Sequence, residues 1–448
     1  METPICDFVR SYAARAPLRL HMPGHKGRGP LGAEALDITE VPGADVLYAP
    51  AGIIAESEAN AAALFGSAKT VYSTEGSSLC IRAMLCLARL HARANGKAPL
   101  VLAGRNAHKA FLSAVALLDI PVEWLYPDAG GVLSCPIDAS ALERRLSDGA
   151  VPPCAVYITS PDYLGGRADV AALAEVCHRH DALLLVDNAH GAYLKFMSTS
   201  LHPLDLGADL CCDSAHKTLG VLTGGAYLHI AKSAPPSLCE AANRAMSLFA
   251  STSPSYLILQ SLDAVNGRSK SDYVNDITST SGQVSRLRAA LQSDGWDCVG
   301  DEPLKLTLAT KRRGYTGTEI AALLARRGVV CEFADPDYVV FMLTSSLPED
   351  SFSVLYDALH SLPPRAPVTA APPVLWKPSV LLSPRAAMLA PAETLPVERA
   401  IGRALASPCV SCPPAVPILV CGEAVDASAV EAFRYYGIER IEVVRAAE

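Results

Sequence analysis

Two polar segments, one with an aspartate (Asp187) and one with a lysine thirty residues later (Lys217), carry the residue types of a catalytic site. The first, Asp213–Thr218 (DSAHKT), follows an apolar stretch and contains a serine, a histidine and a lysine. The second, Asp187–Gly191 (DNAHG), follows the apolar run ALLLV and begins with a carboxylate. A lone lysine in a polar turn is usually a solvated surface residue, but open α/β sheets bind their ligands at the carboxyl ends of strands. An acid and a lysine at two such strand ends can hold one cofactor.

Pyridoxal phosphate needs this pair, because a lysine amine forms its Schiff base and a carboxylate keeps its pyridine nitrogen protonated. Its phosphate needs hydroxyls and backbone N–H groups at the start of a helix. Ser73–Ser78 (STEGSS) supplies such groups, although serine-rich segments are also ordinary helix caps. Ser214 and His216 could add phosphate contacts beside the lysine. His108 could stack on the cofactor ring, and a helix-cap or core histidine is the alternative interpretation.

The hydrophobic pattern between Glu58 and Ile230 predicts the elements that position these residues. Helical patterns begin near Leu79 and cover His108–Leu118 and Val170–His180. Short apolar runs predict strands at Pro99–Ala103, Ala155–Thr159, Ala182–Val186, Ala208–Cys212 and Gly225–Ile230. Alternating strands and helices with continuously apolar strands predict an α/β fold with a mostly parallel sheet covered on both faces.

A smaller α/β unit is predicted after Ser271. Strands are expected at Leu304–Thr310, Val329–Phe333 and Tyr338–Leu343, and helices at Thr318–Arg327 and Phe352–Leu362. Thr318 is the expected N-cap of the first helix and Gly328 its stop. Seven prolines within Pro363–Pro384 predict an extended linker. The expected division is an N-terminal segment (1–57), a large cofactor domain (58–270), a small domain (271–362), a linker (363–384) and a C-terminal domain (385–448).

Composition excludes several classes of protein. Of 448 residues, half are hydrophobic and 19% are charged, which predicts a globular chain with a substantial core. The net charge of −8 argues against a nucleic-acid or anionic-membrane binder. No apolar run is long enough to span a membrane and no signal-peptide pattern opens the chain, so a cytoplasmic protein is expected. Most of the fourteen cysteines lie in apolar stretches and are expected to be reduced. Cys409 and Cys412 form a lone C-x-x-C pair, a weak indication of zinc, so no metal is predicted.

Taken together, segments along nearly the whole chain resemble the ornithine/lysine/arginine decarboxylase family, pyridoxal-phosphate enzymes of the aspartate-aminotransferase fold class. In chain order they are Leu20–Gly27 (LHMPGHKG), Asp37–Glu40 (DITE), Ser73–Ser78 (STEGSS), Arg105–Phe111 (RNAHKAF), Tyr157–Gly166 (YITSPDYLGG), Leu183–Gly191 (LLLVDNAHG), Asp213–Thr218 (DSAHKT), Ser251–Tyr256 (STSPSY) and Cys421–Glu423 (CGE). The resemblance implies pyridoxal-phosphate fold type I, with a seven-stranded sheet in the large domain.

The resemblance also implies a role for each candidate site residue. Lys217 would form the Schiff base, Asp187 would pair with the pyridine nitrogen, and His108 would stack on the ring. Ala189 would pack on the opposite face of the ring, and His190 would lie near its 3-hydroxyl group. The cofactor phosphate would be held by residues of the STEGSS and DSAHKT segments: Gly76, Ser77, Ser78, Ser214 and His216. Ser251–Tyr256 of such enzymes often reaches a partner subunit's phosphate, which implies a homodimer or a dimer of dimers.

Two segments depart from the family pattern. Cys412–Pro417 reads CPPAVP where the family commonly has YPPGIP, which puts a substrate-side contact in doubt. Asp162 stands in SPDYLGG where an uncharged residue is more usual. The chain starts almost directly at the decarboxylase segment, without the response-regulator-like wing that builds decamers in large bacterial members. It is therefore similar to the short subgroup that includes biosynthetic arginine and lysine decarboxylases.

The predicted function is pyridoxal-phosphate-dependent decarboxylation of a basic amino acid, with a role in amino-acid metabolism and polyamine biosynthesis. The substrate could be arginine, lysine or ornithine. Another pyridoxal-phosphate reaction, such as transamination or lysis, uses the same cofactor contacts. An inactive cofactor-binding homologue is a further alternative, against which the intact Lys217 and Asp187 argue.

The distal cation of a basic substrate needs a carboxylate in a desolvated pocket. Glu423 is the first candidate, because the family's C-terminal domain lies over the mouth of the active site. Asp37 and Glu40 are the other acids within family-like segments. The alternative for Glu423 is a solvated residue or a cap of the helix expected near Ser428.

Overall fold

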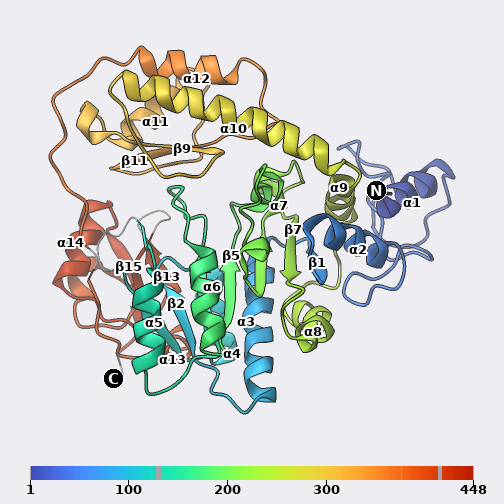
Figure 1. The fold of residues 1–448 in the computed structure, drawn as a ribbon, viewed down its shortest axis with the longest axis horizontal. Helices are drawn as coiled ribbons and strands as arrows, with labels where there is room; N and C mark the ends of the chain where they lie inside the picture. The colour runs from blue at the N-terminus through green and yellow to red at the C-terminus, as the bar shows by residue number, and fades with distance from the viewer. Residues whose placement is uncertain (1, 128–133, 375, 412–415, 447–448) are drawn as a thin grey trace. The chain divides into compact units, whose positions relative to one another are not determined.

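The computed structural model describes residues 2–127, 134–374, 376–411 and 416–446 (Figure 1). The chain divides into two compact units. The first comprises Met1–Leu100, Glu143–Tyr157 and Val170–Asn275, and the second comprises Val101–Leu142, Ile158–Asp169 and Asp276–Glu448. No helix among the described residues is long and apolar enough to cross a membrane.

A seven-stranded sheet organises the large domain, in the order β1-β7-β6-β5-β4-β2-β3. Its strands are β1 (Lys69–Ser73), β2 (Val101–Gly104), β3 (Val122–Leu125), β4 (Ala155–Thr159), β5 (Leu183–Asp187), β6 (Leu210–Asp213) and β7 (Ala226–Ile230). β2 pairs parallel with β3, and β5 with β6, whereas β7 runs antiparallel to both β1 and β6. The predicted mostly parallel α/β sheet is thus confirmed.

Helices of the first unit pack on these strands. α3 (Ser77–Ala94) packs on β6 and β7, and α6 (Val170–Arg179) packs on β5. Every residue of β5 and β6 is buried, which explains why the sequence shows continuous rather than alternating apolar runs there. The remaining elements of this unit are α1 (Pro4–Ala14), α2 (Ile53–Phe65), α7 (Ala215–Thr218), α8 (Pro236–Ser247), α9 (Tyr256–Asn266) and the short 3₁₀ helices Ala192–Phe196 and Pro203–Leu206.

The second unit contains a four-stranded antiparallel sheet in the order β10-β11-β9-β8. Its strands are β8 (Asp297–Val299), β9 (Lys305–Ala309), β10 (Phe333–Ala334) and β11 (Tyr338–Met342), accompanied by α11 (Gly317–Ala325) and α12 (Ser351–His360). The C-terminal segment adds α13 (Pro384–Met388), β12 (Ala392–Pro396), β13 (Cys409–Ser411), β14 (Pro417–Val420), α14 (Ala427–Tyr435) and β15 (Arg440–Val444). α4 (Lys109–Leu118) also lies in this unit, and α5 (Ala139–Asp148) and α10 (Lys270–Ser293) span the division points of the chain.

Two local predictions in the small domain are wrong. The helix expected to be capped by Thr318 begins at Gly317, and Thr316 is its N-cap. The Thr316 hydroxyl accepts from the Glu319 N–H while the Glu319 carboxylate accepts from the Thr316 N–H, a capping box that leaves Thr318 inside the helix. The strand expected at Val329–Phe333 is reduced to Phe333–Ala334. The residues from Val329 to Glu332 have no strand structure, and Val330 is 85% exposed.

Candidate active site

Lys217 and His190 are brought together at the carboxyl edge of the sheet. Lys217 lies on α7, directly after β6, and its Nζ is 2.9 Å from Nε2 of His190, which follows β5. His190 is buried and Lys217 is half-buried. β5 and β6 are parallel neighbours in which Asp187 pairs with Cys212, so their carboxyl ends meet at one edge. The DNAHG and DSAHKT segments therefore meet as the sequence predicted.

Asp187 is the last residue of β5 and is buried. The Tyr157 hydroxyl donates to its Oδ2 at 3.1 Å. Its Oδ1 accepts from the Ala189 N–H at 3.2 Å and from the Cys212 thiol at 3.6 Å. These donors fix the orientation of the carboxylate at the strand end. Tyr157 and Cys212 were not predicted as site residues, because neither contact can be seen without the register of β4, β5 and β6.

The start of α3 provides donors suited to a phosphate group. Its N-cap, Gly76, has a φ of 73°, and no side chain among the described residues caps the helix. The Ser214 hydroxyl donates to the Ser77 hydroxyl at 2.8 Å, so the two predicted phosphate segments are in contact. Ser78 lies in the first turn of the helix. A helix that begins without a side-chain cap leaves its first N–H groups available to an anion.

Backbone packing holds this helix start close to the segment after α7. The Gly76 N–H donates to Gly224 O at 2.7 Å. Gly224 has a φ of +99°, and a Cβ added there would lie 2.8 Å from Thr74 O, so only glycine fits. His216 is anchored beside them, with its Nδ1 3.0 Å from Gly225 O. Burial lowers the pKa of His216, which favours a neutral donor over a charged one.

His108 lies in the second unit, exposed, as the N-cap of α4. Its Nδ1 accepts from the Ala110 N–H at 3.2 Å, so its Nδ1 carries no proton. The alternative interpretation of His108 as a helix cap is therefore confirmed, with Nδ1 as the capping atom. The ring-stacking role stays a prediction.

Glu423 has a different partner from the one predicted. Arg105 Nη2 donates to Glu423 Oε2 at 2.6 Å, both side chains are buried, and the Val420 N–H donates to the same oxygen at 2.8 Å. Burial raises the pKa of Glu423, while Arg105 acts in the opposite direction. Glu423 therefore pairs with a cation of the chain itself. It does not cap a helix either, since α14 is capped by Asp426.

The remaining candidate acids, and the residues that depart from the family pattern, lie in different local environments. Asp37 lies 3.1 Å from His25 Nε2, and Glu40 is exposed. Asp162 closes the turn of SPDYLGG by accepting from the Gly166 N–H at 2.7 Å, and burial raises its pKa. Its role in this structure is that of a turn residue. Cys412 and most of CPPAVP lie outside the described residues, and the described cysteines form no disulfide.

The first unit thus supplies the donor set that pyridoxal phosphate requires. A lysine amine beside a histidine, a buried carboxylate one strand away, and paired serine hydroxyls at an uncapped helix start fit an aldehyde, a pyridine nitrogen and a phosphate respectively.

Comparisons with known proteins agree with this chemistry. Residues 3–296 match the family model described as "Orn/Lys/Arg decarboxylase, major domain". An arginine decarboxylase of Halalkalibacterium halodurans is 29% identical over 95% of this chain and 92% of its own length. An arginine decarboxylase of Bacillus subtilis is 28% identical over 95% of this chain and 91% of its own length.

Solved structures show the same fold. The constitutive lysine decarboxylase of E. coli has a TM-score of 0.77 at 17% identity, covering 99% of this chain and 82% of that one. Lysine decarboxylase A of Pseudomonas aeruginosa has a TM-score of 0.80 at 17% identity, covering 99% and 80%. Pyridoxal phosphate is the cofactor of this fold and family, and the chain is an amino-acid decarboxylase. It belongs to the Orn/Lys/Arg decarboxylase family.

Proposed function

We propose that this enzyme decarboxylates a basic amino acid to the corresponding amine and CO₂, with arginine as the first substrate to test. The observation that carries the proposal is the placement of Lys217 Nζ 2.9 Å from His190, at the sheet edge where Asp187 ends β5. The choice of arginine rests on the relatives named arginine decarboxylase, which span 95% of this chain. The amine released would enter polyamine biosynthesis.

Bound pyridoxal phosphate supplies an electron-withdrawing ring that accepts the electron pair left when the carboxylate departs. Lys217 would hold the cofactor covalently and yield its place to the amine of the substrate. His190 Nε2 can take the proton that the Lys217 ammonium must lose before its amine becomes a nucleophile. Asp187 would hold a proton on the ring nitrogen, and Ser77, Ser78 and Ser214 would bind the phosphate.

We also propose a homodimer as the smallest assembly. Several apolar side chains of the N-terminal segment are largely exposed in the single chain, among them Leu18 (84%), Leu20 (83%) and Leu31 (86%). Several large exposed apolar side chains in one segment support a surface that binds protein. Light scattering of the purified protein should give a mass of two or four chains. A monomer at micromolar concentration would contradict this part of the proposal.

Substrate choice is tested by supplying arginine, lysine and ornithine in parallel, each with the holoenzyme, and identifying the amine by chromatography. Agmatine as the main product supports the proposal in its specific form. Cadaverine or putrescine as the main product keeps the basic substrate class and replaces arginine. Turnover of none of the three, with an acidic or neutral amino acid decarboxylated instead, would overturn the proposed class.

A further inference from the structure

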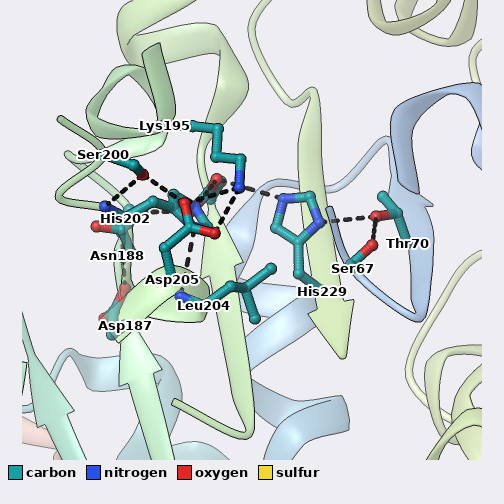
Figure 2. A network of polar contacts seen from close by, with 12 residues as sticks. Ser67, Thr70, Asp187, Asn188, Lys195, Ser200, His202, Leu204, Asp205 and His229 are labelled. Carbon is teal, nitrogen blue, oxygen red and sulfur yellow. Dashed lines mark hydrogen bonds and ion pairs between the residues drawn. The ribbon is translucent and has the colours of Figure 1, made fainter. Parts of the chain in front are cut away.

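A buried anion lies four residues before Lys217. Asp213 ends β6, and His202 and His229 both face its Oδ2, with Nε2 distances of 2.9 Å and 3.3 Å. All three side chains are inaccessible to solvent. Figure 2 shows the contacts that continue outward, from His229 to Thr70 and Ser67 on one side, and around His202 to Ser200 and Asp205 on the other. This network could not be predicted from local patterns, because its members come from four separate segments.

The surrounding hydrogen bonds define where the protons lie. His202 Nδ1 accepts from the Leu204 N–H, so its proton is on Nε2 and points at Asp213. Burial lowers the pKa of His229, and this effect is larger than the rise in pKa caused by Asp213. Burial alone would raise the pKa of Asp213, but His202 and His229 hold it well below its ordinary value. Asp213 is therefore a permanently ionised carboxylate at neutral pH.

The second oxygen of Asp213 connects the two strand ends of the active site. Asn188 Nδ2 donates to Asp213 Oδ1 at 2.6 Å, and the Asn188 N–H donates to Cys212 O at 3.0 Å. Asn188 directly follows Asp187. On the other side, the Ser214 carbonyl accepts from the Lys217 N–H at 3.0 Å, which forms the first turn of α7. Asp213 thus lies between the residue after Asp187 and the turn that carries Lys217.

We propose that Asp213 is a positioning residue, which fixes the turn carrying Lys217 against the strand end carrying Asp187 through its bond to Asn188. The proposal rests on the assignment of Lys217 as the cofactor lysine. Both oxygens of the fully buried Asp213 carboxylate are already bound, so Asp213 is not available to a ring nitrogen. Losing one of these hydrogen-bond donors would leave the buried Asp213 anion partly uncompensated, which is costly in folding free energy.

A metal ion is the competing explanation for this cluster. His202, Cys211 and Asp213 have ligand atoms within 4.8 Å of one another. However, burial raises the pKa of the Cys211 thiol well above its ordinary value, and the His202 proton is already donated to Asp213. Metal binding would require the Cys211 proton to leave and the His202 proton to move from Nε2 to Nδ1, where the Leu204 N–H now donates. Hydrogen bonding to Asp213 accounts for the positions of these side chains without any change in protonation.

The test compares Asn188→Ala and Asp213→Asn with Asp209→Asn. Asp209 is a matched control, because it is also buried and paired with a histidine (His178, 3.1 Å), but it lies at the opposite end of β6. Asn188→Ala is the milder of the two test variants and leaves the histidine contacts of Asp213 in place. Each apoprotein is first checked for folding by circular dichroism and for bound metal by elemental analysis.

Two readouts separate positioning from general stability. One is the rate at which the apoprotein takes up pyridoxal phosphate, with borohydride trapping and peptide mapping of the modified lysine. The other is hydrogen exchange of the segment 211–219 in the apoprotein. We expect uptake slower by about tenfold or more and faster exchange in this segment for both test variants, with Asp209→Asn close to the parent.

Each outcome has a defined meaning. Equal uptake and exchange in the parent and in Asn188→Ala would overturn the proposal, as would a stoichiometric metal ion lost in Asp213→Asn. If the parent is not modified at Lys217, the proposed function fails. The exchange comparison would still test whether Asp213 orders this turn.

Discussion

Arg105 and Glu423, 318 residues apart in the sequence, form an ion pair of 2.6 Å within the second unit. The guanidinium also lies over the rings of Trp124 and Tyr126, at 5.2 Å and 5.7 Å from their centres. One partner follows β2 and lies three residues before His108, while the other follows β14. The pair therefore joins the C-terminal segment to the segment that carries a predicted cofactor residue.

Glu423→Gln should destabilise the fold by about 3–5 kcal/mol, because it leaves the Arg105 charge buried and uncompensated. Arg105→Met should cost a similar amount, and the double variant Arg105→Met, Glu423→Leu should regain most of the loss. Denaturant unfolding of the four proteins measures these changes. A Glu423→Gln variant with parental stability and a raised KM for a basic substrate would instead assign Glu423 to the substrate.

Tyr157→Phe should lower kcat by about tenfold with little change in KM, because a hydrogen bond to a charged group contributes about 1.5–3 kcal/mol. The change removes the donor to Asp187 Oδ2 and keeps the buried ring. Tyr227→Phe is the matched control, since the Tyr227 hydroxyl is buried in the same sheet and has no hydrogen-bond partner among the described residues. Steady-state kinetics of both variants give the kcat and KM values to compare with those of the parent. Equal losses in the two would mean that Tyr157 acts through packing alone.

Lys217→Ala should abolish turnover and leave the fold intact, because the half-buried side chain contacts the polar His190 at the edge of the sheet. Activity and thermal unfolding are measured on the same preparation, with the exposed Lys232→Ala as the control. Decarboxylation by Lys217→Ala at an appreciable fraction of the parental rate would exclude Lys217 as the cofactor lysine.

Glu58 should make the folded state less stable as the pH rises. This buried residue of α2 accepts from the Tyr72 N–H at 2.9 Å, and burial raises its pKa from 4.5 to about 8. The folded protein therefore holds a proton that the unfolded chain has lost, and stability decreases between pH 4.5 and about 8. Above that range the contribution of Glu58 is constant.

Glu58→Gln keeps the acceptor for Tyr72 and removes the ionisation. Unfolding free energies measured across this pH range should fall less steeply for Glu58→Gln than for the parent. Glu56→Gln, an exposed change on the same helix, should reproduce the parental slope. Parallel curves for the parent and Glu58→Gln would show that Glu58 does not titrate in this range.

Local patterns predicted the sheet and the main site residues because they depend on short-range features. Continuous apolar runs gave β4 to β7 within two residues at each end, and polar residues after those runs located Asp187 and Lys217. The N-cap was predicted at Thr318, although the spacing of Thr316 and Glu319 is that of the capping box found in the structure. Val329–Phe333 was predicted as a strand, but only its last residue, Phe333, pairs with β11, while Val330 is 85% exposed.

Contacts between distant segments could not be predicted in this way. Glu423 was matched to a substrate cation from the family resemblance. Its partner in the structure, Arg105, is 318 residues away in sequence, and only the folded chain brings the two charges together. The same holds for Asn188 and Asp213, whose bond depends on the pairing of β5 with β6.

The central claim is that this chain removes the carboxylate of a basic amino acid with a cofactor held by Lys217. The most direct measurement is the release of labelled CO₂ from carboxyl-labelled arginine by the holoenzyme, quantified together with the amine. The account predicts equal amounts of CO₂ and agmatine, and neither product from Lys217→Ala. Keto acid without CO₂, or CO₂ release that survives in Lys217→Ala, would contradict it.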